Sequence, residues 1–273
     1  MTRIRPGRQL RASCLALVAV ALGAGLGLGS PQAIETERIF LSNGIEVLLM
    51  PDPASRVVTV ISVVGAGSSY EDARLSGASH FLEHMLFNGT QRRTQKQLYD
   101  AVDAAGGFNN AFTRRTHAAY MMTMPGPELA LALDLQSDML FHSRIPATKL
   151  EKERGIILEE FSMGRDAGGA TLDDILRRET FPNSSYGLPI LGSEASIRSL
   201  GHEEVVEYYE RHYVPENMQL VLLGGFDPET ARDLLESSFG RQRPASVGPE
   251  LPPTPHAIKS TLLIRHAHDG PTG

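Results

Sequence analysis

Cysteine and tryptophan are almost absent from this sequence. Its 273 residues include one cysteine, Cys14, and no tryptophan. A single cysteine cannot form a disulfide within the chain, and it excludes a metal site built from several thiolates. The rest of the composition, with 41% hydrophobic and 21% charged residues, is ordinary for a globular protein. It excludes wholesale disorder, a collagen-like chain and a coiled-coil rod.

Acidic residues are missing from the first 33 positions, which carry four arginines. The remainder therefore holds 22 basic and 32 acidic residues, a formal net charge of −10. An acidic body argues against nucleic acid as the main partner, because the phosphate backbone attracts basic surfaces.

Long apolar runs are also missing, except for the stretch of apolar residues and glycines at 14–29. A basic start, a short apolar run and a small-residue exit are typical of a secretory signal peptide, which we place at residues 1–33. Sixteen residues are short for a membrane-spanning helix, which needs about 20. An uncleaved membrane anchor is the alternative. We expect a protein secreted across the inner membrane into a bacterial periplasm, with no membrane contact other than this segment.

The remaining sequence predicts strands in groups and helices in groups, which favours an α+β fold over a doubly wound parallel sheet. Apolar runs flanking Ser42-Asn43-Gly44 predict a hairpin, and Thr94 with Gln97 predicts a capping box at a helix start. We expect mixed structure with short helical pieces at 165–200. The other expected strands are 56–64 and 218–224, and residues 108–124 are expected to form one long strand or a hairpin. The expected helices are 77–88, 95–105, 127–142, 148–164, 202–212 and 228–239.

The segment from His80 to His84 carries the clearest chemical signal. On a helix, His80, Glu83 and His84 fall within about 100° of arc, and apolar side chains cover the other side. Two imidazoles one turn apart can bind one metal ion, while Glu83 is spaced to act on a water molecule that the metal activates. The order H-x-x-E-H is the inverted zincin motif. The alternative is a polar helix face with no metal.

A catalytic zinc takes three protein ligands, and the candidate for the third lies on the helix expected near 148–164. Glu153 and Glu160 are seven residues apart and share one face with Ile157. Carboxylates on an apolar face are costly unless they are paired or bound to metal. Glu159 falls on the opposite, polar side and is expected to be solvated. A buried ion pair is the alternative for Glu160.

Several motifs together resemble the pitrilysin/insulinase family of zinc metallopeptidases, which includes the mitochondrial processing peptidases. The resemblance covers roughly residues 36–240. The motifs that carry it are GASHFLEHMLFNGT (77–90), GGFNNAFT (106–113), ERGIILEEFSM (153–163), YGLPILGSEASIRSL (186–200) and YVPENMQLVLLGGF (213–226).

By this resemblance one zinc ion per chain is held by His80, His84 and Glu160. Glu83 is the catalytic base, and Glu153 is a second acid that supports the site. The resemblance also implies a two-layer sandwich of a mainly antiparallel sheet and helices, with residues 34–240 as the N-terminal peptidase domain.

The family further implies how a substrate binds. The segment matching Asn110 and Ala111 lies on an edge strand, to which a peptide adds as a further strand. The implied activity is a metalloendopeptidase that hydrolyses internal bonds of short or unfolded peptides.

A second homologous domain or subunit, in a homo- or heterodimer, is the partner that the resemblance implies. We expect residues 241–273 to be a Pro-rich linker and the truncated start of that second domain. Two other readings compete. S-ribosylhomocysteine lyase shares H-x-x-E-H but uses a cysteine ligand, and here only Cys14 exists. A catalytically incomplete or non-catalytic partner subunit of a two-part peptidase is the other alternative.

Overall fold

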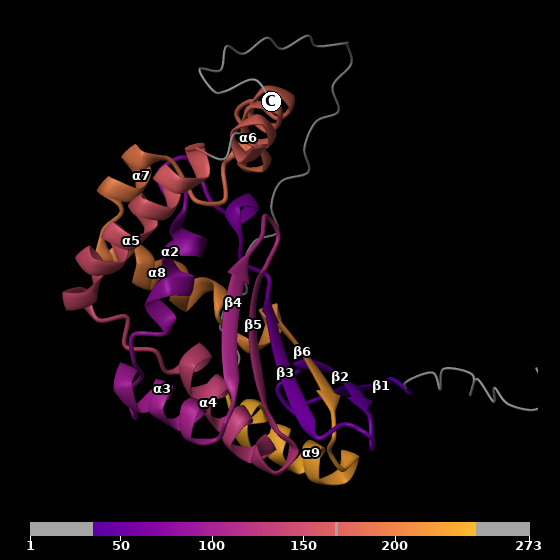
Figure 1. Cartoon of the computed structure of the whole chain (residues 1–273). Coiled ribbons are helices and arrows are strands. Elements are labelled where there is room, and N and C mark those ends of the chain that lie inside the picture. The colour runs from indigo at the N-terminus through magenta and orange to yellow at the C-terminus, as the bar shows by residue number, and fades with distance from the viewer. Residues whose placement is uncertain (1–34, 167–168, 244–273) are drawn as a thin grey trace, which may run out of the picture. The chain divides into compact units, whose positions relative to one another are not determined.

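The computed structural model describes residues 35–166 and 169–243 (Figure 1). The predicted signal peptide at 1–33 and residues 244–273 of the predicted linker lie outside the described residues. Within the described ranges, no helix has the length and apolar character needed to cross a membrane.

The strands are β1 (Glu37–Phe40), β2 (Glu46–Pro51), β3 (Val57–Val64), β4 (Phe108–Thr113), β5 (Ala118–Pro125) and β6 (Met218–Gly224). The α-helices are α2 (Ala78–Leu86), α3 (Gln95–Ala104), α4 (Leu129–Phe141), α5 (Ala147–Asp166), α6 (Gly169–Thr180), α7 (Glu194–Ser199), α8 (His202–His212) and α9 (Pro228–Leu235).

The six strands form one sheet in the order β1-β2-β6-β3-β5-β4. Every neighbouring pair is antiparallel except β2 and β6, which are parallel. The hairpin predicted around Ser42-Asn43-Gly44 is confirmed as β1 and β2, and Gly44 supplies the positive φ of 91° that its turn needs. The α+β fold with a mainly antiparallel sheet is therefore confirmed, and β4 lies at one edge of the sheet.

One face of the sheet is buried beneath helices, which makes the two layers of the sandwich. Alternate residues of β3 are buried, among them Val58, Val60 and Val64, because side chains alternate between the two faces of a strand. Helix α4 packs on β3 and β5, and α2 packs on β4 and β5. Figure 1 shows α2, α5, α7 and α8 gathered beside the sheet.

The predictions of local structure are confirmed with one difference. The capping box of Thr94 and Gln97 is present at the start of α3. Residues 165–200, expected to hold only short helical pieces, contain the 12-residue helix α6. Its apolar residues Leu172, Ile175 and Leu176 follow the i, i+3, i+4 spacing of one helix face, on which Ile175 is buried while Leu172 and Leu176 are exposed. The helical pattern is thus present in the sequence, and the expectation of short pieces underestimated the length of this helix.

Candidate metal centre

Helix α2 presents the H-x-x-E-H side chains on its polar face. The helix begins after Gly77, whose φ of 93° lies in the left-handed region. Its apolar side chains are fully buried, which fixes the rotation of the helix about its axis; they are Phe81, Leu82, Met85 and Leu86. His80, Glu83 and His84 are consequently held on the opposite side, as the sequence predicts.

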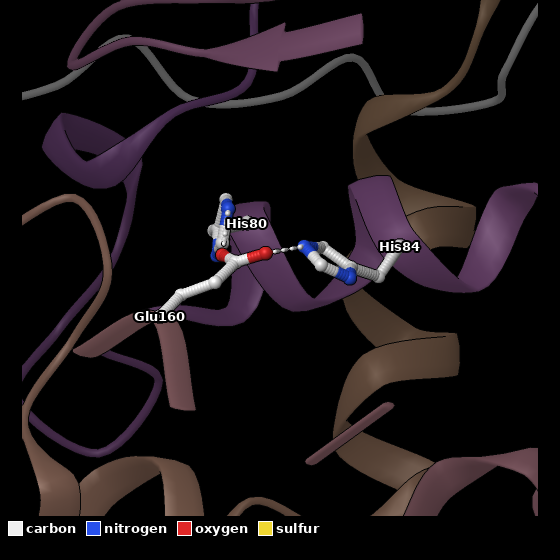
Figure 2. Close-up of side chains that lie close together, drawn as sticks. All are labelled: His80, His84 and Glu160. Atoms are coloured by element: carbon white, nitrogen blue, oxygen red, sulfur yellow. Dashed lines mark ion pairs between the residues drawn. The ribbon is translucent and has the colours of Figure 1, made fainter. Parts of the chain in front are cut away.

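Helix α5 packs against α2 and brings Glu160 to the two imidazoles. Oε2 of Glu160 lies 3.6 Å from Nε2 of His80, and its Oε1 lies 3.7 Å from Nε2 of His84. Figure 2 shows the carboxylate between the two rings. One ligand atom from each of the three residues lies within 4.8 Å of the others, and they are the one such cluster among the described residues. Glu159 is exposed, as expected for the opposite face of the helix.

The cluster fits a zinc ion by its donor set as well as by its spacing. Two imidazole nitrogens and one carboxylate oxygen are a common ligand set of catalytic zinc sites, in which a fourth position is left open. Burial, with the nearby His84, lowers the pKa of His80 to about 3. The imidazole therefore stays neutral near pH 7, which is the form that binds metal.

Glu153 lies two turns before Glu160 on α5 and contacts Nδ1, the other ring nitrogen of His84. Its Oε2 lies 3.4 Å from Nδ1 of His84, and its side chain is buried. Asn88 donates through Nδ2 both to Oε1 of Glu153, at 3.1 Å, and to the backbone oxygen of His84, at 3.0 Å. Sequence reasoning missed Asn88, which lies in the turn after α2, although its position four residues after His84 within the helix expected at 77–88 was a signal that could have identified it.

Glu83 is held by a residue of the edge strand. Thr113 Oγ1 at the end of β4 donates a hydrogen bond of 2.5 Å to Oε2 of Glu83. Burial raises the pKa of Glu83, against the lowering effect of this hydrogen bond and of the nearby His84. Thr113 was also missed, and only its place in the motif at 106–113 connects it with the site.

A pocket of about 260 Å³ opens beside the metal cluster. Among the residues that line it are five singled out from the sequence, namely Glu83, His84, Asn110, Ala111 and Glu153. Phe87 and Tyr99 add aromatic surface to the same walls. The structure thus brings together all seven predicted residues, five around the pocket and His80 and Glu160 in the adjoining cluster with His84.

A family model described as insulinase (peptidase family M16) matches residues 46–194, more than half of the chain. The chain belongs to the insulinase family. A second model, described as the inactive domain of this peptidase family, matches residues 199–271. Membership confirms the resemblance found in the motifs and removes the lyase alternative.

Two curated relatives illustrate the match. The chain is 32% identical over 204 residues to an uncharacterized zinc protease, YmxG, of Bacillus subtilis, covering 75% of this chain and 50% of the relative. It is 31% identical over 221 residues to the beta subunit of the mitochondrial-processing peptidase of Bos taurus, covering 80% of this chain and 45% of that subunit. This insulinase-family chain therefore spans about half the length of the curated relatives it matches.

Solved structures show the same fold. The periplasmic protease PqqL of Escherichia coli superposes with a TM-score of 0.73 at 22% identity, covering 82% of this chain and 26% of PqqL. A protease of Helicobacter pylori superposes with a TM-score of 0.68 at 20% identity, covering 82% of this chain and 54% of that one. Together with the relatives named as zinc proteases, the His80–His84–Glu160 cluster confirms zinc as the cofactor.

Proposed function

We propose that this chain is the metal-bearing half of a zinc endopeptidase that hydrolyses internal bonds of short or unfolded peptides. The observation that carries the proposal is the convergence of the His80–His84–Glu160 cluster and Glu83 beside one pocket next to a sheet edge. His80, His84 and Glu160 are the zinc ligands in this proposal. A bound zinc ion supplies Lewis-acid chemistry, since it polarises a carbonyl and lowers the pKa of water.

Glu83 acts as the general base. Its carboxylate accepts a proton as the water oxygen bonds to the carbonyl carbon, and it then passes this proton to the amine nitrogen, so that the amide C–N bond breaks and the amine leaves. Thr113 keeps one carboxylate oxygen in place through its hydrogen bond. The other carboxylate oxygen of Glu83, Oε1, is then available to accept the proton of the water.

The substrate peptide binds along β4. This strand has no neighbour on its outer side among the described strands, so its outward backbone groups are available to pair with an extended peptide. Asn110 is exposed on β4, and Ala111 follows it; both line the pocket. Main-chain pairing gives affinity with little sequence demand, while Phe87 and Tyr99 offer aromatic contact to one substrate side chain.

The decisive experiment measures zinc content and cleavage of unstructured peptides by the same purified chain, with mass spectrometry of the products. We expect one zinc per chain and internal cleavage that a chelator abolishes. Glu160→Gln should lose zinc and cleavage together. Glu159→Gln, the neighbouring exposed carboxylate on the same helix, is the matched control and should keep both.

A second candidate function is that of a catalytically incomplete or non-catalytic subunit, and the similarity to the beta subunit of the mitochondrial-processing peptidase favours it. Zinc bound at one per chain without cleavage would support this reading and would point to a homologous second domain or subunit as the missing partner. Cleavage restored by that partner would then assign the activity to the pair. Absence of bound zinc would contradict the site itself.

We also propose that the protein acts in the periplasm. The basic start and the apolar run at 14–29 support this location, as does the description of PqqL as a periplasmic protease. Cell fractionation tests it, with the N-terminus of the mature protein read by mass spectrometry. Recovery in the cytoplasmic fraction with residues 1–33 intact would contradict it.

A further inference from the structure

Glu71 places a buried carboxylate against the first turn of α2. It follows the short 3-10 turn η1 (Ser68–Tyr70), and only 4% of its surface is exposed. Its Oε2 accepts the backbone N–H of Gly77 at 2.7 Å, and its Oε1 accepts the N–H of Ser79 at 2.8 Å. The first N–H groups of a helix have no partner within the helix. Since the residue preceding α2 is Gly77, which has no side chain, Glu71 supplies the cap from outside.

No cation neutralises this carboxylate in the part of the chain that the structure describes. The neighbouring Arg74 forms its ion pair with Glu204. The charged and titratable groups that act on Glu71 are Asp72 in its own loop and Tyr208 on α8, whose hydroxyl hydrogen-bonds Ser79 Oγ at 2.7 Å. The positive end of the α2 dipole is therefore its main electrostatic partner.

The ionised form of Glu71 costs folding free energy in this arrangement. Burial raises the pKa of Glu71 to about 7, although the hydrogen bonds from Ser79 and Gly77 lower it. A raised pKa means that the ionised carboxylate is less favourable in the folded protein than in water. A cap that served stability alone would resemble the exposed Thr94 on α3, which avoids a buried charge. Stability does not explain Glu71.

The turn that Glu71 holds is also packed too closely to shift. A Cβ at Gly77 would lie 2.9 Å from the backbone oxygen of Leu191, and one at Gly192 would lie 2.5 Å from that of Ser76. The backbone before α2 is thus in contact with the 191–192 loop. Within this contact the two hydrogen bonds to Glu71 anchor the backbone of the first turn, and the residue directly after Ser79 is His80.

We propose that Glu71 is a positioning residue of the metal centre: its two hydrogen bonds fix the N-terminus of α2, and through it the directions of His80, Glu83 and His84. The inference rests on the proposed zinc site, but it concerns affinity for the metal and can fail while that site stands. It explains why a carboxyl group whose ionised form is unfavourable in the folded protein is placed at this helix end, because functional sites accept such costs.

The test compares zinc affinity, by competition with a chelator, in the full-length wild type, Glu71→Gln and Glu204→Gln. Glutamine keeps one carbonyl acceptor and removes the charge, so one of the two N–H groups loses its partner. We expect Glu71→Gln to bind zinc about tenfold more weakly or worse, as for other groups that orient ligands. Its resistance to urea at pH 8, measured without zinc, should equal or exceed that of the wild type.

Glu204→Gln is the matched control, because Glu204 also accepts a helix N-terminal N–H, that of Gly201 at 2.7 Å, on a helix without metal ligands. Its zinc affinity should stay within about twofold of the wild type. Equal zinc affinities of Glu71→Gln and the wild type would overturn the inference alone. So would weaker zinc binding accompanied by a matching loss of stability at pH 8, which is the signature of a purely structural cap.

A variant that does not fold and a wild type that binds no zinc have separate consequences. If Glu71→Gln does not fold, Glu71→Asp replaces it: the charge remains, but the shorter side chain cannot reach both N–H groups, and zinc affinity should again fall. Unchanged affinity in Glu71→Asp would overturn the inference. A wild type that binds no zinc would overturn the proposed function and this inference with it.

Discussion

Glu153 and His84 meet at Nδ1 of the imidazole, at 3.4 Å, so that the other ring nitrogen, Nε2, is the one that lies 3.7 Å from Glu160. The two glutamates are seven residues apart on α5 and reach the same histidine from two sides. A carboxylate that contacts the ring nitrogen not bound to the metal fixes the orientation of a ligand histidine and raises its basicity. One helix therefore provides both a candidate ligand and a carboxylate placed to orient a second candidate ligand.

Replacing Glu153 with glutamine should weaken zinc binding about 10- to 100-fold, because the acceptor that orients His84 is lost. Asn88 would also lose the charge on its hydrogen-bond acceptor. Competition with a chelator measures the effect. Glu151→Gln, an exposed carboxylate on the same helix, is the control and should bind zinc as the wild type does. Unchanged affinity in Glu153→Gln would remove this residue from the site.

Replacing Glu83 with glutamine should leave zinc bound and reduce peptide cleavage at least about 100-fold, because general-base catalysis contributes roughly that much or more. Glutamine has a similar shape and can still accept the hydrogen bond from Thr113. Metal analysis and a cleavage assay on the same sample separate the two effects. Cleavage at the wild-type rate would show that another group takes the proton.

The parts of the fold and site that depend on local sequence could be predicted. The polar face of α2 follows from the helical period between His80 and His84, and Glu153 and Glu160 share a face for the same reason. The capping box at Thr94 is likewise a signal contained in four residues.

Contacts between distant segments could not be predicted in this way. The hydrogen bond from Thr113 to Glu83 joins residues 30 apart, and its partners are brought together only when β4 packs against α2. The parallel pairing of β2 with β6 joins Val47 to Leu220, and no local pattern encodes it. Glu71 shows the limit most clearly, since a charged residue in a loop is expected to be solvated, and only the packed structure buries it.

Asp138 on α4 provides a test of stability away from the metal. Its carboxylate is fully buried and accepts hydrogen bonds from Thr90, Arg92 and Arg93. Asp138→Asn should lower the free energy of unfolding by about 2 kcal/mol, because the buried side chain loses its charge and its charge-assisted hydrogen bonds to partly exposed arginines. Asp134→Asn, which changes a more exposed partner of the same arginines, should cost less than about 1 kcal/mol. Urea denaturation distinguishes the two, and equal losses would contradict the difference in burial.

The raised pKa of Glu71 predicts how stability depends on pH. The folded-state pKa is about 7, against an ordinary value of 4.5. Because the folded state holds the proton more tightly, the group contributes stability that is fully present below pH 4.5 and is lost as the pH rises through about 7. At 1.36 kcal/mol for each pKa unit, the loss reaches about 3 kcal/mol by pH 8.

The variant Glu71→Gln has no carboxyl group to titrate at this position and should not show this loss of stability. The free energy of unfolding of both metal-free proteins is measured by urea denaturation at pH 4.5 and pH 8. The difference between the two proteins at each pH cancels the contribution of other titrating groups, such as His212. The free energy of unfolding of the wild type relative to Glu71→Gln should fall between these two pH values, and a constant difference would mean that Glu71 titrates normally in the folded protein.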